Sequence, residues 1–233
     1  MKTILKNENF QRFVTGLILG FCFFGSYFHS LLLFSLILIA LLFIILFFEW
    51  PKLINLKITN FKYWLISFIY PILPISTLIY LNLTFRSKDF LLPLYPFFVS
   101  WTADTGAYIL GKLIGKHKIC PTISPGKSWQ GLFGGFISVT IFNILYLPGI
   151  KTFPFTIYLQ SFFPILLFSF LITIIAFLGD IFISFLKRKI GLKDTGNLLP
   201  GHGGLLDRFD SVLFVSTLLM LIILANKLIN NFL

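Results

Sequence analysis

The chain has 233 residues, of which 57% are apolar and only 12% charged, and its mean hydropathy is +0.93. Soluble domains carry about 25% charged residues, so this composition excludes a water-soluble globule and predicts an integral membrane protein. The formal net charge of +11 does not indicate a nucleic-acid partner, because the basic residues lie in short segments between apolar runs, as membrane topology requires.

Seven apolar runs are expected to form membrane-spanning helices, since one span needs roughly 20 apolar residues. In chain order they are 13–28, 30–48, 63–83, 90–110, 129–147, 160–186 and 211–230. The first two are expected to form a helical hairpin, and the basic N-terminus before them is interpreted as part of a retained first span rather than a cleaved signal. The fold class predicted is therefore all-α, a polytopic helical bundle of about seven transmembrane helices, with six to eight as the range.

The distribution of basic residues predicts the orientation. With the N-terminus inside, 15 of the 19 Lys and Arg residues fall on the cytoplasmic side, and the exceptions are Arg86, Lys88, Lys151 and Lys227. This asymmetry follows the positive-inside rule. Two long polar loops, 111–128 and 187–210, are then expected to face the cytoplasm.

Acidic residues are scarce, so each can be considered singly. Glu8, Glu49 and Asp89 flank apolar runs and are interpreted as solvated helix ends. Asp104 and Asp180 instead lie in the apolar stretches WTADTGAY and AFLGDIFIS, where an ionised carboxylate costs several kcal/mol. Each is expected to face a partner, an ion or water, and the alternative is a carboxylate that caps a helix end.

A second group of polar residues lies in 184–210, SFLKRKIGLKDTGNLLPGHGGLLDRFD. It combines a basic cluster, a glycine-rich turn at 200–204, and two aspartates, Asp207 and Asp210, spaced to share one helical face. Carboxylates beside a basic, glycine-rich loop indicate a divalent metal and phosphates. Taken singly, the basic cluster is also explained as a topology anchor and the turn as an ordinary tight turn.

A third group lies in 102–131. Gly106, Gly111 and Gly115 narrow the predicted helix so that another backbone or a ligand can approach. Lysines and the run Ser124–Ser128 follow, and their hydroxyl, ammonium and backbone N–H groups suit a triphosphate. The spacing does not match a Walker A loop.

These residues resemble the phosphatidate cytidylyltransferase (CDP-diacylglycerol synthase) family. The family's C-terminal signature is matched without a gap by Ser184, Lys187, Arg188, Lys193, Asp194, Pro200, His202, Gly203, Gly204, Asp207, Arg208 and Asp210. An upstream block is matched by Asp104–Tyr108, Gly111, Lys112, Gly115, Lys116, Ser124, Pro125 and Lys127. The resemblance covers about residues 101–210, and it departs from the family at Ile183, where many relatives have Glu, and at Ser128 and Gln130, where Thr and Glu are common.

The resemblance implies a Mg²⁺-dependent nucleotidyltransferase that joins CTP to phosphatidate, giving CDP-diacylglycerol and pyrophosphate. It implies catalytic roles for Asp180, Lys187, Arg188, Lys193, Asp194, His202, Asp207 and Arg208. It implies nucleotide binding by Asp104, Tyr108, Ser124, Lys127, Gly203 and Gly204. It implies metal binding by Asp180, Ser184, Asp207 and Asp210.

Further expectations follow from the same resemblance. Residues 1–90 would supply N-terminal transmembrane helices and 91–233 the catalytic region. The location would be a bacterial-type inner membrane, with the site facing the cytoplasm and membrane lipid around the chain. A second, monovalent or divalent cation and a homodimer stay open alternatives.

Three other function classes agree less well with the sequence. A transporter also uses carboxylates and glycine-broken helices within the membrane, but here the polar groups gather on one side and no inverted repeat is visible. A CDP-alcohol phosphotransferase would carry an Asp-Gly-x-x-Ala-Arg core, which the sequence lacks. A plain membrane anchor would not need several aspartates near glycine turns.

Overall fold

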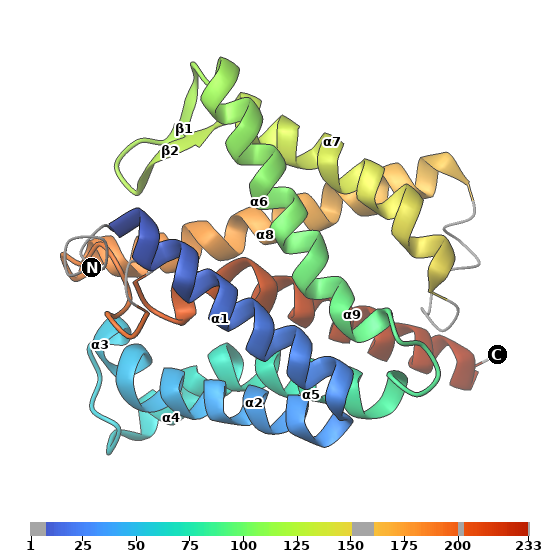
Figure 1. Ribbon diagram of the computed structural model, residues 1–233, viewed down its shortest axis with the longest axis horizontal. Helices are drawn as coiled ribbons and strands as arrows, with labels where there is room; N and C mark the ends of the chain where they lie inside the picture. Colours follow the sequence, from blue (N-terminus) through green and yellow to red (C-terminus); the bar gives the residue numbers. More distant parts are fainter. Residues whose placement is uncertain (1–7, 151–160, 200–202, 233) are drawn as a thin grey trace. The chain divides into compact units, whose positions relative to one another are not determined.

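The computed structural model describes residues 8–150, 161–199 and 203–232, with side chains described from Val14 to Leu228 outside the gaps. Figure 1 shows long helices joined by short connections. Each of the seven predicted spans contains a helix, so the all-α prediction is confirmed. The principal helices are α1 (Glu8–His29), α2 (Leu31–Ile44), α4 (Phe61–Ser67), α5 (Leu73–Phe85), α6 (Tyr95–Ile114), α7 (Trp129–Tyr146), α8 (Phe162–Lys189) and α9 (Leu206–Phe232).

Five helical stretches of the described residues are long and apolar enough to cross a membrane: Leu31–Ile54, Phe61–Phe85, Trp129–Gly149, Phe162–Lys189 and Leu206–Leu228. The apolar part of α1, Val14–His29, is shorter. The protein is therefore a multi-pass membrane protein. Helix α6 contains Asp104 and Lys112 and is absent from this set of five apolar stretches.

The chain divides into two compact units. The first comprises the residues up to Leu83 together with Leu186–Phe209, and the second comprises Thr84–Phe185 together with the residues from Asp210 onward. The chain therefore passes between the units within α5, within α8 and within α9. The predicted division near residue 90 stays a prediction, and each unit is described by itself.

The first unit is held together by buried aromatic side chains. Tyr27, Phe34, Trp50 and Tyr63 are fully buried. The Trp50 indole N–H donates to Ser67 Oγ (2.9 Å), which satisfies a polar group that would otherwise be costly in an apolar interior. The predicted span 63–83 is a broken helix, because Pro71 lies in a π-helical segment, Phe68–Ile72, between α4 and α5. A second π-helical turn, Ile45–Glu49, leads into the short helix α3 (Trp50–Ile54).

In the second unit, α6 and α7 pack through glycines. A Cβ added at Gly106 would lie 2.7 Å from the Gly134 carbonyl oxygen, and one added at Gly134 would lie 2.6 Å from the Gly106 carbonyl oxygen. Both distances are too short for a side chain, so only glycine allows the two backbones to approach this closely. The prediction that α6 glycines admit another backbone is confirmed.

A chain of buried hydrogen bonds joins α6, α7 and α8. The Tyr95 hydroxyl lies 2.9 Å from Asn143 Oδ1, and Asn143 Nδ2 donates to Ser169 Oγ (2.9 Å). All three side chains are fully buried. Because unpaired polar groups are expensive in a low-dielectric interior, this chain fixes the relative register of the three helices.

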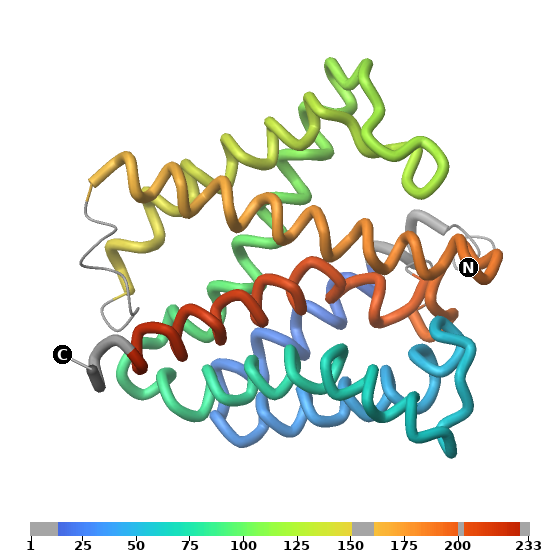
Figure 2. The backbone as a smooth tube through the Cα atoms, turned by 180° about the vertical axis from the view of Figure 1, so that it is seen from behind, coloured from blue at the N-terminus to red at the C-terminus, as the bar shows by residue number. Residues whose placement is uncertain are grey.

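The predicted loop 111–128 is more ordered than its composition suggested. Its first residues complete α6, and its second part forms an antiparallel hairpin of β1 (Lys118–Cys120) and β2 (Ser124–Ser128). The hairpin connects α6 to α7 (Figure 2). Ser128 Oγ accepts from the Gly131 N–H (3.1 Å) and so caps the N-terminus of α7.

Candidate active site

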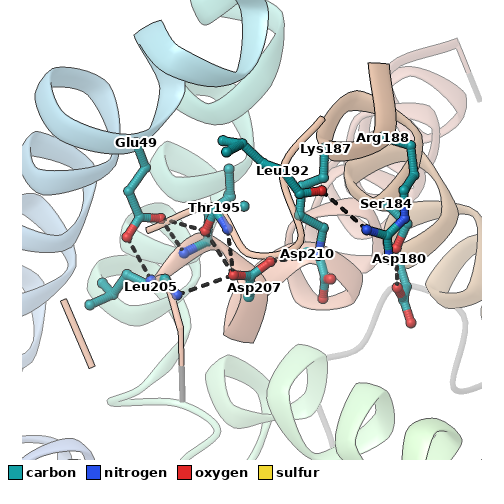
Figure 3. A network of polar contacts seen from close by, with 12 residues as sticks. Glu49, Asp180, Ser184, Lys187, Arg188, Leu192, Thr195, Leu205, Asp207 and Asp210 are labelled. Carbon is teal, nitrogen blue, oxygen red and sulfur yellow. Dashed lines mark hydrogen bonds and ion pairs between the residues drawn. The ribbon is translucent and has the colours of Figure 1, made fainter. Parts of the chain in front are cut away.

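An ion pair joins the hairpin to α8 within the second unit. Lys127 Nζ contacts Asp180 Oδ2, and the side chains of the two residues are 20% and 25% exposed. Ser184, one helical turn after Asp180, donates its hydroxyl to Asp180 Oδ1 (3.2 Å; Figure 3). The Lys127 ammonium also lies 5.4 Å from the centre of the Phe177 ring, a cation–π distance. Each oxygen of Asp180 thus has a donor, the Lys127 ammonium at Oδ2 and the Ser184 hydroxyl at Oδ1.

Lys127 lies among three acidic residues, Asp104, Asp180 and Asp210. Burial lowers the pKa of the Lys127 ammonium, but the carboxylate of Asp180, with smaller effects from Asp104 and Asp210, outweighs burial and raises the pKa above its ordinary value. Lys127 is therefore a cation at neutral pH. The three carboxylates and one ammonium leave an excess of negative charge when the acids are ionised.

A cavity of about 290 Å³ opens beside this ion pair. It is lined by Asp104 and Tyr108 from α6, Ser124 and Lys127 from the hairpin, and Asp180 from α8. The structure thus brings together the residues that were predicted to lie on the nucleotide side, although they are spread over 24 positions of the sequence: Asp104, Tyr108, Ser124 and Lys127. Tyr108 is 65% exposed, and the Lys112 ammonium lies 5.7 Å from the centre of its ring.

The oxygen donors of this cluster fit a Mg²⁺ ion that is shared with a substrate. Among the described residues, no three His, Cys, Asp or Glu side chains are close enough to hold a metal by themselves. Mg²⁺ usually binds one or two carboxylates together with substrate phosphates and water. Asp180, with the Ser184 hydroxyl beside it, supplies donors of that kind.

In the first unit, four donors lie within hydrogen-bond distance of Asp207. Its Oδ1 contacts Lys187 Nζ (2.7 Å), and the two side chains are 7% and 12% exposed. Its Oδ2 accepts from the Thr195 N–H (2.8 Å) and the Gly204 N–H (3.1 Å), and the Thr195 hydroxyl lies 3.0 Å from the same oxygen (Figure 3). Within the described part of the glycine-rich turn, the Gly204 N–H thus binds the Asp207 carboxylate.

Glu49 lies in the same network, which corrects its interpretation as a solvated helix end. It is 1% exposed. Oε1 accepts from the Leu205 N–H (2.7 Å), and Oε2 accepts from the Leu206 N–H (2.8 Å) and the Thr195 hydroxyl (3.0 Å). Because α9 begins at Leu206, Glu49 satisfies amide groups that a helix N-terminus leaves without partners, and the helix dipole favours its charge.

The interpretation of Asp89 as a solvated helix end is also wrong. Asp89 is 6% exposed, and its Oδ1 accepts from the Leu91 N–H (3.3 Å), so it closes a turn before α6. The side chain of Glu8 lies outside the described residues.

Of the remaining predicted residues, Asp210 belongs to the second unit and is buried, at 9% exposure. Most of the others lie on the surface of the first unit or outside the described residues. Lys193, Asp194 and Arg208 are exposed, and Arg188 is exposed and donates to the Leu192 carbonyl (3.2 Å). Gly203 has φ of +81°, which explains why glycine is needed there. His202 lies outside the described residues, so its role stays a prediction.

Residues 61–225 match the cytidylyltransferase family. The chain belongs to this family. Among curated proteins it is 47% identical over 131 residues to phosphatidate cytidylyltransferase of Staphylococcus haemolyticus, covering 56% of this chain and 48% of that protein. It is 40% identical over 141 residues to the protein of the same name from Staphylococcus aureus, covering 60% of this chain and 52% of that protein. The chain thus spans about half the length of the curated relatives it matches.

The family match bears directly on the two groups of residues. It encloses the cavity of the second unit and the Lys187–Asp207 pair of the first, and the predicted resemblance is confirmed. Neither the family nor the names of the relatives favours the transporter alternative. Glu49 precedes the matched region, so family signatures could not have identified it.

Proposed function

We propose that this cytidylyltransferase transfers the cytidylyl group of CTP to phosphatidate, giving CDP-diacylglycerol and pyrophosphate. The observation that carries the proposal is the cavity in which Lys127, Ser124 and Tyr108 lie beside Asp104 and Asp180. Hydroxyl groups and an ammonium ion suit phosphates, and the carboxylates suit a cation that accompanies them. The names of the curated relatives support phosphatidate as the acceptor.

The reaction needs little acid–base catalysis. A phosphatidate phosphate oxygen attacks the α-phosphorus of CTP, a new P–O bond forms, and the bond to the β-phosphate oxygen breaks to release pyrophosphate. The attacking oxygen is already ionised at neutral pH, so the barrier is dominated by repulsion between two polyanions and by alignment. Lys127 remains cationic and is oriented by Asp180, so it would lower this repulsion at the cavity.

Mg²⁺ is proposed as the cofactor, with Asp180, Ser184 and Asp210 as the donors of the second unit. When bound, it would neutralise phosphate charge and align the transferred group. Asp207 is a further proposed ligand, and a cation there would compete with Lys187 for Oδ1. A second monovalent or divalent cation stays an alternative.

The basic residues of the first unit are proposed to bind phosphate groups. Arg188, Lys193 and Arg208 are exposed, and an Arg side chain can bind phosphate through two parallel hydrogen bonds. A site that faces the cytoplasm is proposed from the same charge asymmetry that predicts the topology.

A direct assay tests the proposal. Purified protein in detergent micelles should convert phosphatidate and labelled CTP to CDP-diacylglycerol only when a divalent metal is present. Asp180→Asn should lower turnover by about 100-fold or more, because it removes a charge beside both the cation and Lys127. Asp89→Asn is the matched control, since it makes the same substitution at a carboxyl group that does not line the cavity. Full turnover by the Asp180 variant, or no product from the wild type, would overturn the proposal.

A further inference from the structure

We propose that Glu49 is a positioning residue: acting through Thr195, it holds Asp207 and the start of α9 in the geometry required for turnover. The inference deepens the proposed cytidylyl transfer and rests on it for its kinetic test. All the groups involved belong to the first unit, and Figure 3 shows them converging on the segment before α9.

The first line of support is the number and kind of donors that Glu49 receives. Three donors converge on its two oxygens: the N–H groups of Leu205 and Leu206 and the Thr195 hydroxyl, at 2.7, 2.8 and 3.0 Å. These partners are separated from Glu49 by 146 to 157 positions of sequence. Glu49 therefore connects the end of the first apolar hairpin to the entrance of the last helix.

The second line of support is the shared hydroxyl. Thr195 Oγ1 lies 3.0 Å from Glu49 Oε2 and 3.0 Å from Asp207 Oδ2. A threonine hydroxyl has one hydrogen, so it can donate to only one of these oxygens at a time. The Thr195 N–H also donates to Asp207 (2.8 Å). A change at Glu49 therefore alters the hydrogen bonding of Asp207 without touching Asp207 itself.

The third line of support is steric. A Cβ added at Gly196 would lie 3.1 Å from Glu49 Oε1. A Cβ added at Gly204 would overlap Thr195 Oγ1 and lie 2.9 Å from Glu49 Oε2. The two glycines thus let the backbone close around the Glu49 carboxylate, so its position and that of the turn are set together.

A simple helix cap would not need this arrangement. Capping can be done by a Ser, Thr, Asp or Asn side chain just before the helix. Glu49 instead reaches the α9 amides from a distant helix and shares a hydroxyl with a predicted catalytic carboxylate. The geometry therefore links capping to the placement of Asp207.

Three variants form the test: Glu49→Gln, Thr195→Val and the double variant. Gln keeps the shape of Glu49 but replaces one acceptor oxygen by an NH₂ group, which leaves at least one buried amide donor without an acceptor. Val keeps the shape of Thr195 but removes the shared hydroxyl. Each single variant should lower kcat per folded molecule by about 10- to 100-fold, as expected for a lost charge-assisted hydrogen bond.

The double variant decides whether the effect runs through Thr195. If it does, the double variant should be no slower than Glu49→Gln alone, because the link is already broken. Thr195→Ser should restore most of the activity lost in Thr195→Val, since it restores the hydroxyl. Ser67→Ala is the matched control: it removes a buried hydrogen-bonded hydroxyl from the same unit, and kcat per folded molecule should stay at the wild-type value.

A second measurement does not depend on activity. Hydrogen–deuterium exchange of a peptide containing Leu205 and Leu206 should be faster in Glu49→Gln and unchanged in Ser67→Ala. Multiplicative losses of kcat in the double variant, or unchanged exchange, would overturn the positioning role. If the wild type makes no CDP-diacylglycerol but the exchange results hold, the proposed function has failed and the structural link stands.

Discussion

Replacing Lys127 by Met should have opposite effects on nucleotide and metal binding. Met keeps most of the length and the apolar stem of Lys127 but removes the ammonium that contacts Asp180. The cavity would then contain Asp104 and Asp180 without this cation, so phosphates should bind more weakly. A divalent cation would no longer compete with an ammonium ion for Asp180 and should bind more tightly.

The magnitude follows from the burial of the pair. Both side chains are mostly buried, at 20% and 25% exposure, so the contact is screened less than a surface salt bridge. A hydrogen bond between charged groups contributes about 1.5–3 kcal/mol, and 1.4 kcal/mol is about a tenfold change in an equilibrium constant. We therefore expect kcat/KM for CTP to fall by about 10- to 100-fold, and the affinity for Mn²⁺, used as a probe for Mg²⁺, to rise by about tenfold.

Two assays measure these changes in the same preparation. CDP-diacylglycerol formation at varied CTP gives kcat/KM, and Mn²⁺ titration followed by electron paramagnetic resonance gives the metal affinity. Lys118→Met is the matched control, because Lys118 is an exposed lysine of the same hairpin that does not line the cavity. Weaker Mn²⁺ binding in the Lys127 variant, or kcat/KM equal to that of the wild type, would refute the reasoning.

Three further predictions concern stability. The pKa of Lys127 is raised in the folded protein, so the stabilisation by its charge is fully present below the ordinary pKa of 10.5 and is lost only as pH rises through the higher folded value. The difference in melting temperature between wild type and Lys127→Met should therefore stay constant between about pH 7 and 9. Gly106→Val should destabilise the protein by about 1–3 kcal/mol, because its side chain would overlap α7; a melting temperature equal to that of the wild type would contradict the observed packing. Asn143→Leu should lower the melting temperature in detergent, since the Tyr95 hydroxyl and the Ser169 hydroxyl lose a buried partner, and combining it with Tyr95→Phe should recover part of the loss.

The fold and part of the site could be predicted because charge is scarce in this chain. Runs of roughly 20 apolar residues correspond to the thickness of the bilayer core, which explains why each predicted span contains a helix. The same scarcity made Asp104 and Asp180 conspicuous, and the structure brings both to one cavity. The glycines of α6 signalled close helix packing because they recur in a segment that is otherwise bulky.

Glu49 could not be recognised in this way. It ends an apolar run and is followed by basic residues, which is how an interfacial carboxylate looks in a sequence. Its partners are two backbone amides and a threonine hydroxyl about 150 positions away, and backbone donors leave no trace in residue identity. The hairpin was missed for a different reason: its strands read KIC and SPGKS, without the alternation of apolar and polar residues that marks a half-buried strand.

The hairpin also gives the molecule a natural place for a spectroscopic reporter. The sequence has two cysteines, Cys22 on α1 and Cys120 at the end of β1, and neither forms a disulfide. Cys120 pairs across the hairpin with Ser124, which lines the cavity. After Cys22→Ser, a fluorophore or spin label would attach only at Cys120, which lies on the same hairpin as Lys127. Its signal would then follow nucleotide entry directly, with no lipid product to extract and no radioactive substrate.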